Sequence, residues 1–324
     1  MLRKKVSLFR TWFKPTVALA ALAVAAGGAQ SSRAQSLIYG IGGTDTGAGP
    51  NAAAYTLFSF NSTAPGTTTT LGTVTPTTGF TLQSIAFQPT TGNLYGFQFN
   101  GTTNQGQLVT INRANGTLAG VGSAFTIGSI TGSAGNSAAI SFNPNNGAVR
   151  LVTGTYGNYR INATTGALLG QDASVGYVAG DPNVNNTFQI SSLNYNRTGT
   201  LYDVDYINGS LATQDLSTGA LTTIGSLGVT PTQGAPSTGF TIGLNNAAFL
   251  NSTVSTQGGA VQDRLYSVNL ATGAATSLGS IGGAATFNTV DIAAFVPEPG
   301  TYALCVAGAL AAGWVVARRR RAVL

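Results

Sequence analysis

Histidine is absent from the sequence, cysteine occurs once, and only 7% of the 324 residues are charged. The absence of histidine excludes a histidine general base, a Ser-His-Asp triad and every histidine-ligated metal site. A single cysteine excludes a disulfide framework and a thiolate metal cluster. Carboxylate chemistry or calcium binding would therefore have to rest on aspartates, which make up eight of the nine acidic residues.

Positive charge is scarce in the middle of the chain and gathered at its two ends. The formal net charge is +6, yet six of the 15 basic residues lie in 1–34 and four form the run 318–321. Residues 35–295 contain no lysine, five arginines and eight aspartates, a net charge of −3. A weakly acidic body is a poor partner for a phosphate backbone, so we expect no nucleic-acid binding.

The N-terminal segment has the order of a secretory signal peptide. Five basic residues lie in 2–14, an apolar stretch of 12 residues follows over 15–26, and small residues surround Ala34. The apolar stretch is too short to span a bilayer. We therefore predict a signal peptide over 1–34, exported by the Sec machinery, with an uncleaved anchor as the alternative.

The C-terminal segment, 296–324, combines three features in a fixed order. The triplet Pro297, Glu298 and Pro299 is followed by an apolar stretch over 301–317 and by Arg318, Arg319, Arg320 and Arg321. Seventeen helical residues span about 26 Å, the lower limit for crossing a bilayer. The order predicts a transmembrane helix, which contains Cys305 as an apolar residue, with its arginine end in the cytoplasm.

This order of motif, apolar helix and arginines resembles the PEP-CTERM sorting signal. The resemblance implies processing near Pro297–Pro299 by exosortase, a membrane cysteine peptidase. It also implies release or transfer of the body to the surface or matrix of a Gram-negative bacterium that makes exopolysaccharide. A plain tail anchor behind a proline-rich linker is the alternative.

The body between the two ends repeats with a period of roughly 50 residues. A β run ending in Asn or Asp starts at Leu57, Leu108, Asn158, Leu211 and Leu265, at spacings of 51, 50, 53 and 54 residues. In most copies a turn with glycine and a strand ending in Leu-Gly, Ile-Gly or Val-Gly follow, which together predict a hairpin. A second hairpin precedes it, at 85–95, 140–150, 192–202 and, without the turn glycine, 240–250.

Two hairpins per repeat make four strands, which is the blade of a β-propeller. Residues 37–40 match the second strand of a blade and 290–295 match the first, so the last strand could complete the first blade. We predict an all-β propeller of about five four-stranded blades over 35–295, closed by its C-terminal strand. An open solenoid and a β-sandwich are the alternatives.

The body also resembles a family of uncharacterised bacterial propeller-like domains that often carry PEP-CTERM tails. The resemblance rests on 57–72, 85–96 and above all 149–186, which includes the run Tyr177–Asn183. It implies the fold and no established activity.

The candidate site residues are four aspartates. Asp203 and Asp205 lie two apart on a predicted strand and so point to one face; with Asp215 nearby they could bind calcium. Asp181 opens a stretch spaced like an EF-hand loop, but that stretch lacks the glycine at position six and the glutamate at position twelve. We expect no cofactor, with calcium as the one alternative. The competing interpretations are a solvated strand face for Asp203 and Asp205 and a simple turn at Asp181.

Tyrosines and arginines of the body have two interpretations each. Tyr39, Tyr95, Tyr202 and Tyr266 recur at strand positions, which favours packing between blades over a carbohydrate platform. The arginines Arg113, Arg150, Arg160 and Arg197 either pair with aspartates between blades or bind a ligand.

Taken together, the patterns predict a non-catalytic binding or structural module associated with exopolysaccharide. The alternatives are a calcium-dependent hydrolase or lactonase, and a component that assembles laterally through blade edges. Convergence of the four aspartates on one central cavity would favour the enzyme.

Overall fold

The computed structural model describes residues 35–43, 53–130, 138–229, 238–255, 261–283 and 288–295. The chain divides into residues 1–34 and 35–324, and every described residue belongs to the second unit. The predicted signal peptide, the sorting motif at Pro297–Pro299 and the arginines 318–321 lie outside the described residues. Within the described ranges, no helix has the length and apolar character needed to cross a bilayer.

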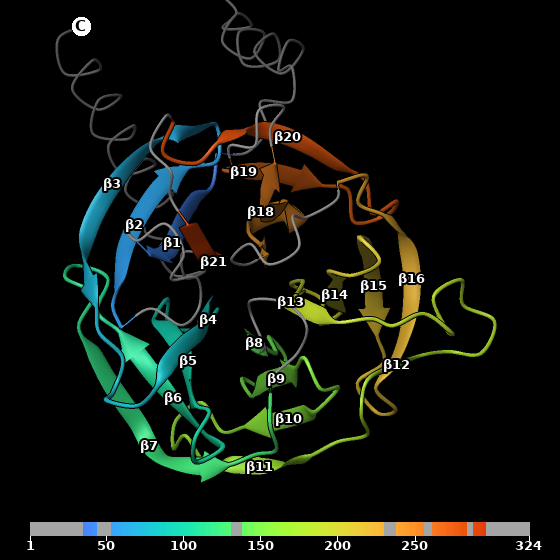
Figure 1. Ribbon diagram of the computed structural model, residues 1–324, viewed down its shortest axis with the longest axis horizontal. Helices are drawn as coiled ribbons and strands as arrows, with labels where there is room; N and C mark the ends of the chain where they lie inside the picture. Colours follow the sequence, from blue (N-terminus) through green and yellow to red (C-terminus); the bar gives the residue numbers. More distant parts are fainter. Residues whose placement is uncertain are drawn as a thin grey trace, which may run out of the picture. The chain divides into compact units, whose positions relative to one another are not determined.

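The described chain forms five β-sheets placed around an axis as the blades of a propeller (Figure 1). From the axis outward, blade 1 consists of β21 (Asn288–Ala294), β1 (Leu37–Gly43), β2 (Tyr55–Asn61) and β3 (Ala64–Val74). Blade 2 consists of β4 (Thr81–Phe87), β5 (Leu94–Asn100), β6 (Gln105–Ile111) and β7 (Leu118–Thr126). Blade 3 consists of β8 (Ala138–Phe142), β9 (Val149–Thr153), β10 (Asn158–Ile161) and β11 (Leu168–Gln171).

The last two blades carry small additions. Blade 4 consists of β13 (Ile190–Tyr195), β14 (Leu201–Asp205), β15 (Ser210–Gln214) and β16 (Ala220–Ser226), and the short β12 (Gly176–Tyr177) pairs parallel with β16. Blade 5 consists of β17 (Gly239–Ile242), β18 (Ala248–Ser255), β19 (Val261–Val268) and β20 (Ala275–Ser280), with the 3-10 helix η2 (Leu244–Asn246) between the first two strands. The expected all-β propeller of five four-stranded blades is confirmed, and β12 is an element that the sequence did not predict.

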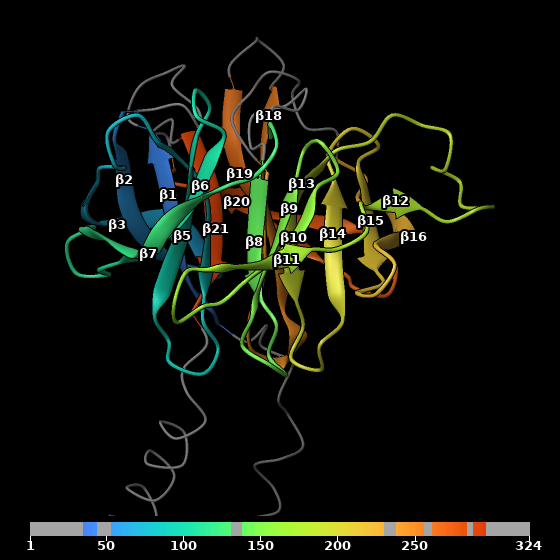
Figure 2. The same ribbon diagram turned by 90° about the horizontal axis from the view of Figure 1, so that it is seen from below.

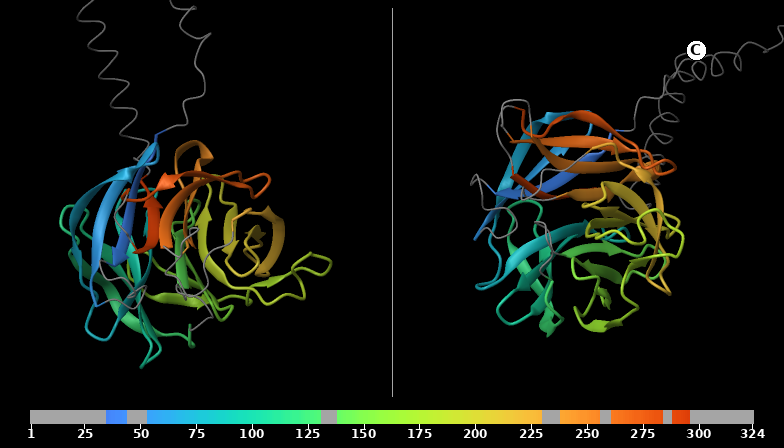
Figure 3. Two further views of the ribbon diagram at one scale, coloured as in Figure 1. Left: turned by 45° about the horizontal axis from the view of Figure 1, so that its top comes forward. Right: turned by 45° about the vertical axis from the view of Figure 1, so that its right-hand side comes forward.

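Blade 1 takes strands from both ends of the body. β1 and β21 pair antiparallel, with Ile38 opposite Ala294 and Ile41 opposite Asp291. Figure 3 shows the two strands, blue and red, side by side.

The apolar core consists of five clusters, each between two neighbouring blades. Between blades 2 and 3, for example, Phe97 and Leu108 pack with Ile140 and Leu151. Neighbouring blades therefore cover both faces of the inner strands, and six of the seven residues of β5 are buried.

Glycines join the blades along their outer edge. Gly116, Gly166, Gly219 and Gly273, here called the rim glycines, occupy the outer turns of blades 2 to 5 with φ between +69° and +79°. Each lies against the backbone of the preceding blade: a Cβ on Gly116 would lie 2.6 Å from the Thr73 carbonyl oxygen, and one on Gly273 would lie 2.5 Å from that of Gly225. Only glycine combines this φ with this approach.

The Leu-Gly and Ile-Gly strand ends form β-bulges. In blades 1, 3, 4 and 5 the pairing of the outer strand shifts by one residue before this glycine, which leaves Leu71, Leu169, Ile224 and Leu278 as the extra residues. A bulge bends the outer strand and increases its twist.

Side-chain oxygens join the blades along the axis. Each innermost strand has a strand partner on one side only, so N–H groups on its other edge need acceptors. One buried residue per innermost strand accepts such a bond from the next strand, and these residues are here called the axial ring. The bonds are Ile140 N to Ser84 Oγ (3.2 Å), Tyr195 N to Ser141 Oγ (3.0 Å), Phe240 N to Ser192 Oγ (2.7 Å), Ala294 N to Thr241 Oγ1 (2.8 Å) and Ile85 N to Asp291 Oδ2 (2.8 Å).

Candidate functional site

One end of the ring, here called the turn face, carries the loops at which the innermost strands end. Viewed from the side in Figure 2, the strands run along the axis and the loops gather at its two ends. The turn face comprises the inner turns 88–93, 143–148, 196–200 and 243–247 and the outer turns 112–117, 162–167, 215–219 and 269–274. Asparagine, threonine and glycine dominate these turns because Asx turns and positive φ favour them.

A pocket of about 360 Å³, here called the axial pocket, opens on the turn face at the axis. All five innermost strands or the turns that follow them contribute to its wall. Its lining consists of Phe87, Pro89, Thr90, Ser141, Phe142, Pro144, Asn194, Tyr195, Asn196, Arg197, Thr241, Ile242 and Ala294. Because the lining comes from the packed inner strands and the tight turns after them, we expect the pocket to be rigid.

Most acceptor atoms of the axial pocket are already bound by the fold. Thr241 Oγ1 accepts from Ala294 N at 2.8 Å, and Asn194 Oδ1 accepts from Ile242 N at 3.3 Å. Asn196 Oδ1 accepts three bonds inside its own turn, from Thr198 N, Thr198 Oγ1 and Thr200 N. The pocket therefore offers the Nδ2 groups of the two asparagines, the Thr241 hydroxyl proton and the Arg197 guanidinium as donors, and the Thr90 hydroxyl, which can donate or accept.

Arg197 is the one charged residue in the lining of this pocket. It is exposed, and no ion pair or hydrogen bond of its side chain is present among the described residues. In the equivalent turns of blades 2 and 3, the position of Arg197 is taken by Pro89 and Pro144. The arginine thus departs from the repeat at the pocket.

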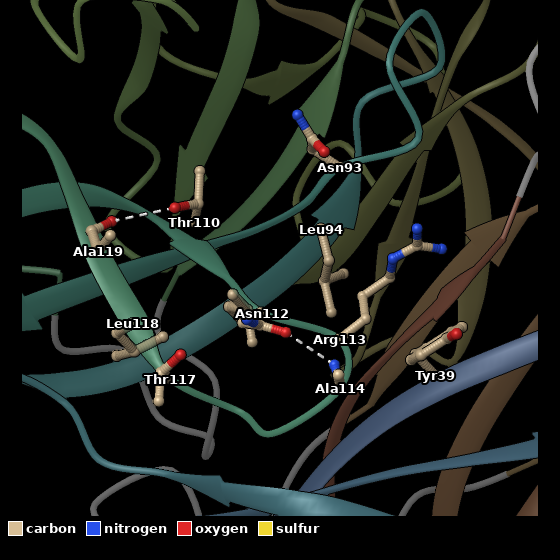
Figure 4. Close-up of a pocket in the computed structure, with 11 residues that line it drawn as sticks. Tyr39, Asn93, Leu94, Thr110, Asn112, Arg113, Ala114, Thr117, Leu118 and Ala119 are labelled. Atoms are coloured by element: carbon tan, nitrogen blue, oxygen red, sulfur yellow. Dashed lines mark hydrogen bonds between the residues drawn. The ribbon is translucent and has the colours of Figure 1, made fainter.

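A second, more open hollow of about 810 Å³, here called the rim groove, lies beside blade 2 on the same face. Its lining consists of Tyr39, Asn93, Leu94, Thr110, Ile111, Asn112, Arg113, Ala114, Thr117, Leu118 and Ala119. Figure 4 shows Arg113 and Tyr39 on the same side of the groove. The Arg113 guanidinium carbon lies 4.8 Å from the centre of the Phe295 ring. The centre of the Tyr39 ring lies 6.5 Å from the centre of the same Phe295 ring.

Asp203 and Asp205 share strand β14, and both are fully buried. The interpretation of a solvated strand face is therefore wrong: the neighbouring blade covers this strand. Burial raises the pKa of Asp203 to about 8, against the opposing charge of Arg150. No hydrogen bond to the Asp203 carboxylate is present among the described residues, whereas the Asp205 carboxylate accepts five, among them one from the Tyr177 hydroxyl at 2.7 Å.

The other two candidate aspartates hold local turns. Asp181 accepts from Thr223 N at 2.7 Å and from Asn183 N at 2.9 Å, and these bonds lower its pKa although burial acts to raise it. Asp215 is exposed in an outer turn, where hydrogen bonds from Ser217 and Thr218 hold its pKa well below the usual range. The turn interpretation of Asp181 agrees with this geometry.

The four aspartates do not meet in one cavity. None of them lines the axial pocket or the rim groove. Within the described ranges, no group of three or more Cys, His, Asp or Glu side chains is placed to hold a metal ion.

Two of the four candidate arginines pair within one blade. Arg150 Nη1 lies 2.6 Å and Arg160 Nε 2.9 Å from Asp172 Oδ2, all three in or directly after the strands of blade 3. The recurrent tyrosines pack between blades: Tyr95 is buried against Phe142, with ring centres 5.0 Å apart, and Tyr266 is buried in the cluster between blades 4 and 5.

Sequence reasoning missed Asn194, Tyr195 and Asn196 as lining of the axial pocket. The one feature of the sequence that could have found them is their position in the repeat. They lie where an innermost strand meets its turn, and this place is at the axis in every blade.

The chain belongs to the family described as "Domain of unknown function (DUF4394)", whose model matches residues 56–293. No curated protein matches the chain. Among solved structures, a protein of unknown function from Bacteroides thetaiotaomicron is 16% identical over 80% of this chain and 71% of its own, with a TM-score of 0.45. One from Bacteroides caccae is 10% identical over 80% and 99%, with a TM-score of 0.40.

TolB from Acinetobacter baumannii is 12% identical over 81% of this chain and 67% of its own, with a TM-score of 0.42. Similarity of this degree says nothing about what the chain binds.

Proposed function

We propose that the protein is an exported binding module of the cell surface or extracellular matrix, which holds a saccharide in the axial pocket without converting it. The observation that carries the proposal is the lining of this pocket by amide, hydroxyl and aromatic side chains from blades 2 to 5. Sugars offer hydroxyl groups to such amides and apolar C–H faces to such rings. A concave site with a few convergent polar groups is the usual form of a small-ligand site.

The catalytic alternative needs carboxylates at the reacting centre. The seven aspartates of the described residues lie outside the lining of the axial pocket, and several are bound to backbone N–H groups or arginines. Their arrangement favours binding over hydrolysis.

A glycan array probed with the full chain tests the proposed function. Thr90 is exposed at the mouth of the axial pocket, so Thr90→Trp should block the pocket and abolish binding. Thr276→Trp, on the exposed side of β20, is the matched control and should bind as the wild type does. Absence of any saccharide bound by the folded wild type would sink the proposal.

Export and sorting form the second part of the proposal, and the order of sequence features supports them. A signal peptide over 1–34 would lead the chain to the Sec machinery, and the segment 296–324 would hold it in the inner membrane until exosortase acts. Replacing Arg318–Arg321 by Ser should weaken membrane retention and change processing. Unchanged fractionation and processing would contradict the sorting assignment.

We further infer that the pairing of β1 with β21 holds the ring closed in solution. The register places Ile38 opposite Ala294, and residues 35–295 contain no cysteine. In a Cys305→Ser background, Ile38→Cys with Ala294→Cys should form an intrachain disulfide on oxidation. The control pair, Phe60→Cys with Ala294→Cys, is two strands apart and should stay reduced. Equal oxidation of both pairs would contradict closure.

A further inference from the structure

The five arginines of the body fall into two groups by their partners. Arg150 and Arg160 bind Asp172, and Arg264 donates to Gln262 at 3.1 Å while it follows the buried Asp263 in sequence. Arg113 and Arg197, like Arg264, have no acidic partner among the described residues. Of these three arginines, Arg113 lines the rim groove and Arg197 lines the axial pocket.

Acidic groups are nearly absent from the turns of the turn face. Among the seven aspartates that the structure describes, only Asp215 belongs to one of these turns, at the outer turn of blade 4. Its carboxylate is occupied by Ser217 and Thr218. The other six lie in strands or in loops at the opposite end of the ring. The mouth of the axial pocket is therefore positive on a body whose net charge is negative.

The hydrogen-bonding groups left free in the axial pocket also favour an anionic ligand. Oxygens of Asn194, Asn196 and Thr241 accept bonds from the fold, whereas their N–H and O–H donors have no acceptor among the described residues. Sugar hydroxyls both donate and accept, whereas a carboxylate only accepts, so free donors beside an arginine suit a carboxylate. Arginine binds carboxylates with two parallel charge-assisted bonds.

The axial pocket and the rim groove are neighbours on the turn face. Phe87 lines the axial pocket, and its ring centre lies 5.2 Å from that of Phe295. Arg113 covers Phe295 at 4.8 Å and is 5.9 Å from the Phe87 ring. Arg113 thus lies against the aromatic pair that borders the axial pocket, and Arg197 lines that pocket. Two arginines in neighbouring hollows suit a chain with acidic groups at intervals better than a single small anion.

We propose that the turn face binds an acidic polysaccharide, with one carboxylate held by Arg197 in the axial pocket and the chain continuing past Phe87 to Arg113 in the rim groove. This inference rests on the proposed function and names its ligand class. An anionic lipid surface fits less well, because recognition of that kind uses four to eight clustered basic residues. The turn face has two arginines, and residues 35–295 have no lysine.

Isothermal titration of the full chain with oligogalacturonate and with its methyl ester tests this inference. We expect the acidic chain to bind at least about tenfold more tightly than the ester, with an affinity that falls as salt rises. Arg197→Gln should weaken binding of the acidic chain about tenfold or more, and Arg113→Gln should weaken it less, because Arg113 also rests on the aromatic rings. Arg264→Gln is the matched control and should bind as the wild type does.

The outcomes separate the inference from the proposed function. Equal binding of acid and ester, unchanged in Arg197→Gln, overturns the acidic ligand and leaves a saccharide module standing. Absence of binding to either, with a blank glycan array, ends both. Binding to phosphatidylserine vesicles that depends on Arg113 and Arg197, without binding to oligogalacturonate, overturns the inference in favour of a membrane surface. Matching thermal midpoints of the variants exclude misfolding as the cause.

Discussion

The outer rim and the axis both join neighbouring blades, but they do so with different chemistry. At the rim, glycines in the turns of blades 2 to 5 lie against the backbone of the preceding blade. At the axis, side-chain oxygens of one innermost strand accept bonds from N–H groups of the next. The rim contact admits no side chain, whereas the axial contact needs one.

This difference explains where the repeat is strict and where it varies. Backbone-to-backbone contact leaves glycine as the only choice, so the rim residue is the same in blades 2 to 5. An acceptor at the axis can be a hydroxyl or a carboxylate, so the axial ring contains three serines, one threonine and one aspartate. The aspartate, Asp291, lies on β21 and binds Ser84 and Ile85 of blade 2.

Replacement of a rim glycine should have the largest effect. Gly166→Ala puts a Cβ against the Val121 carbonyl and strains φ, so we expect a loss of more than about 4 kcal/mol in the free energy of unfolding. Gly147→Ala is the matched control, since Gly147 has φ +71° but open space around it. It should cost about 1–2 kcal/mol from strain alone. Urea unfolding measures both, and equal losses would refute the packing role of the rim.

The carboxylate of the axial ring should make stability depend on pH. Burial raises the pKa of Asp291 to about 7, although hydrogen bonds from Ser84 and Ile85 act to lower it. The folded state therefore holds this proton more tightly than the unfolded state, and the free energy of unfolding falls as pH rises from about 4 to 7. Asp291→Asn removes this titration, so the free energy of unfolding of the variant should change less between pH 4 and 7 than that of the wild type.

Thermal unfolding of both proteins between pH 4 and 8 checks this prediction. Burial also raises the pKa of Asp203 to about 8 and that of Asp263 to about 7, so the variant should keep part of the slope. Two parallel pH profiles would contradict the assignment to Asp291.

Loss of a hydroxyl from the axial ring should have a smaller effect. Ser141→Ala leaves the N–H of Tyr195 buried without its acceptor, which costs about 1–3 kcal/mol. Ser267→Ala is the control, because its hydroxyl lies on an accessible part of β19, and it should change stability by less than about 0.5 kcal/mol. A loss as small in Ser141→Ala as in the control would show that water replaces the axial bond.

Asparagine, which opens the outer turns of blades 2, 3 and 5, should be tolerated in place of Asp215 in the outer turn of blade 4. Asn112, Asn162 and Asn269 stand at the position of Asp215 and accept the same backbone bonds from their own turns. Asp215→Asn keeps these backbone bonds and loses only the charge that the turn favours, so it should lower the thermal midpoint at pH 7 slightly, by less than the other replacements. A clear fall would mean that the charge of Asp215, and not its turn geometry, matters.

The strand pattern of the body could be predicted from the repeat. Turns that need positive φ and strands of alternating character mark each hairpin, and even the degenerate copy at 240–250 pairs as expected, with Phe240 opposite Leu250. The short β12 could not be predicted, because two residues carry no periodicity and the strand exists only where β16 lies beside it.

The site was predictable only in outline. Arg197 was among the candidate residues, and the repeat shows that it replaces the proline of the equivalent turns in blades 2 and 3. The burial of Asp203 and Asp205 was not, since their alternation indicates a shared face but not what covers it.

The sequence by itself determined the four-stranded repeat, the order of its strands and the turns that separate them, because these depend on local backbone preferences repeated every 50 residues or so. Only the tertiary structure decided which polar groups are buried and which meet at the axis. The physical reason is that neighbouring blades cover both faces of each blade, so alternation along a strand no longer separates inside from outside.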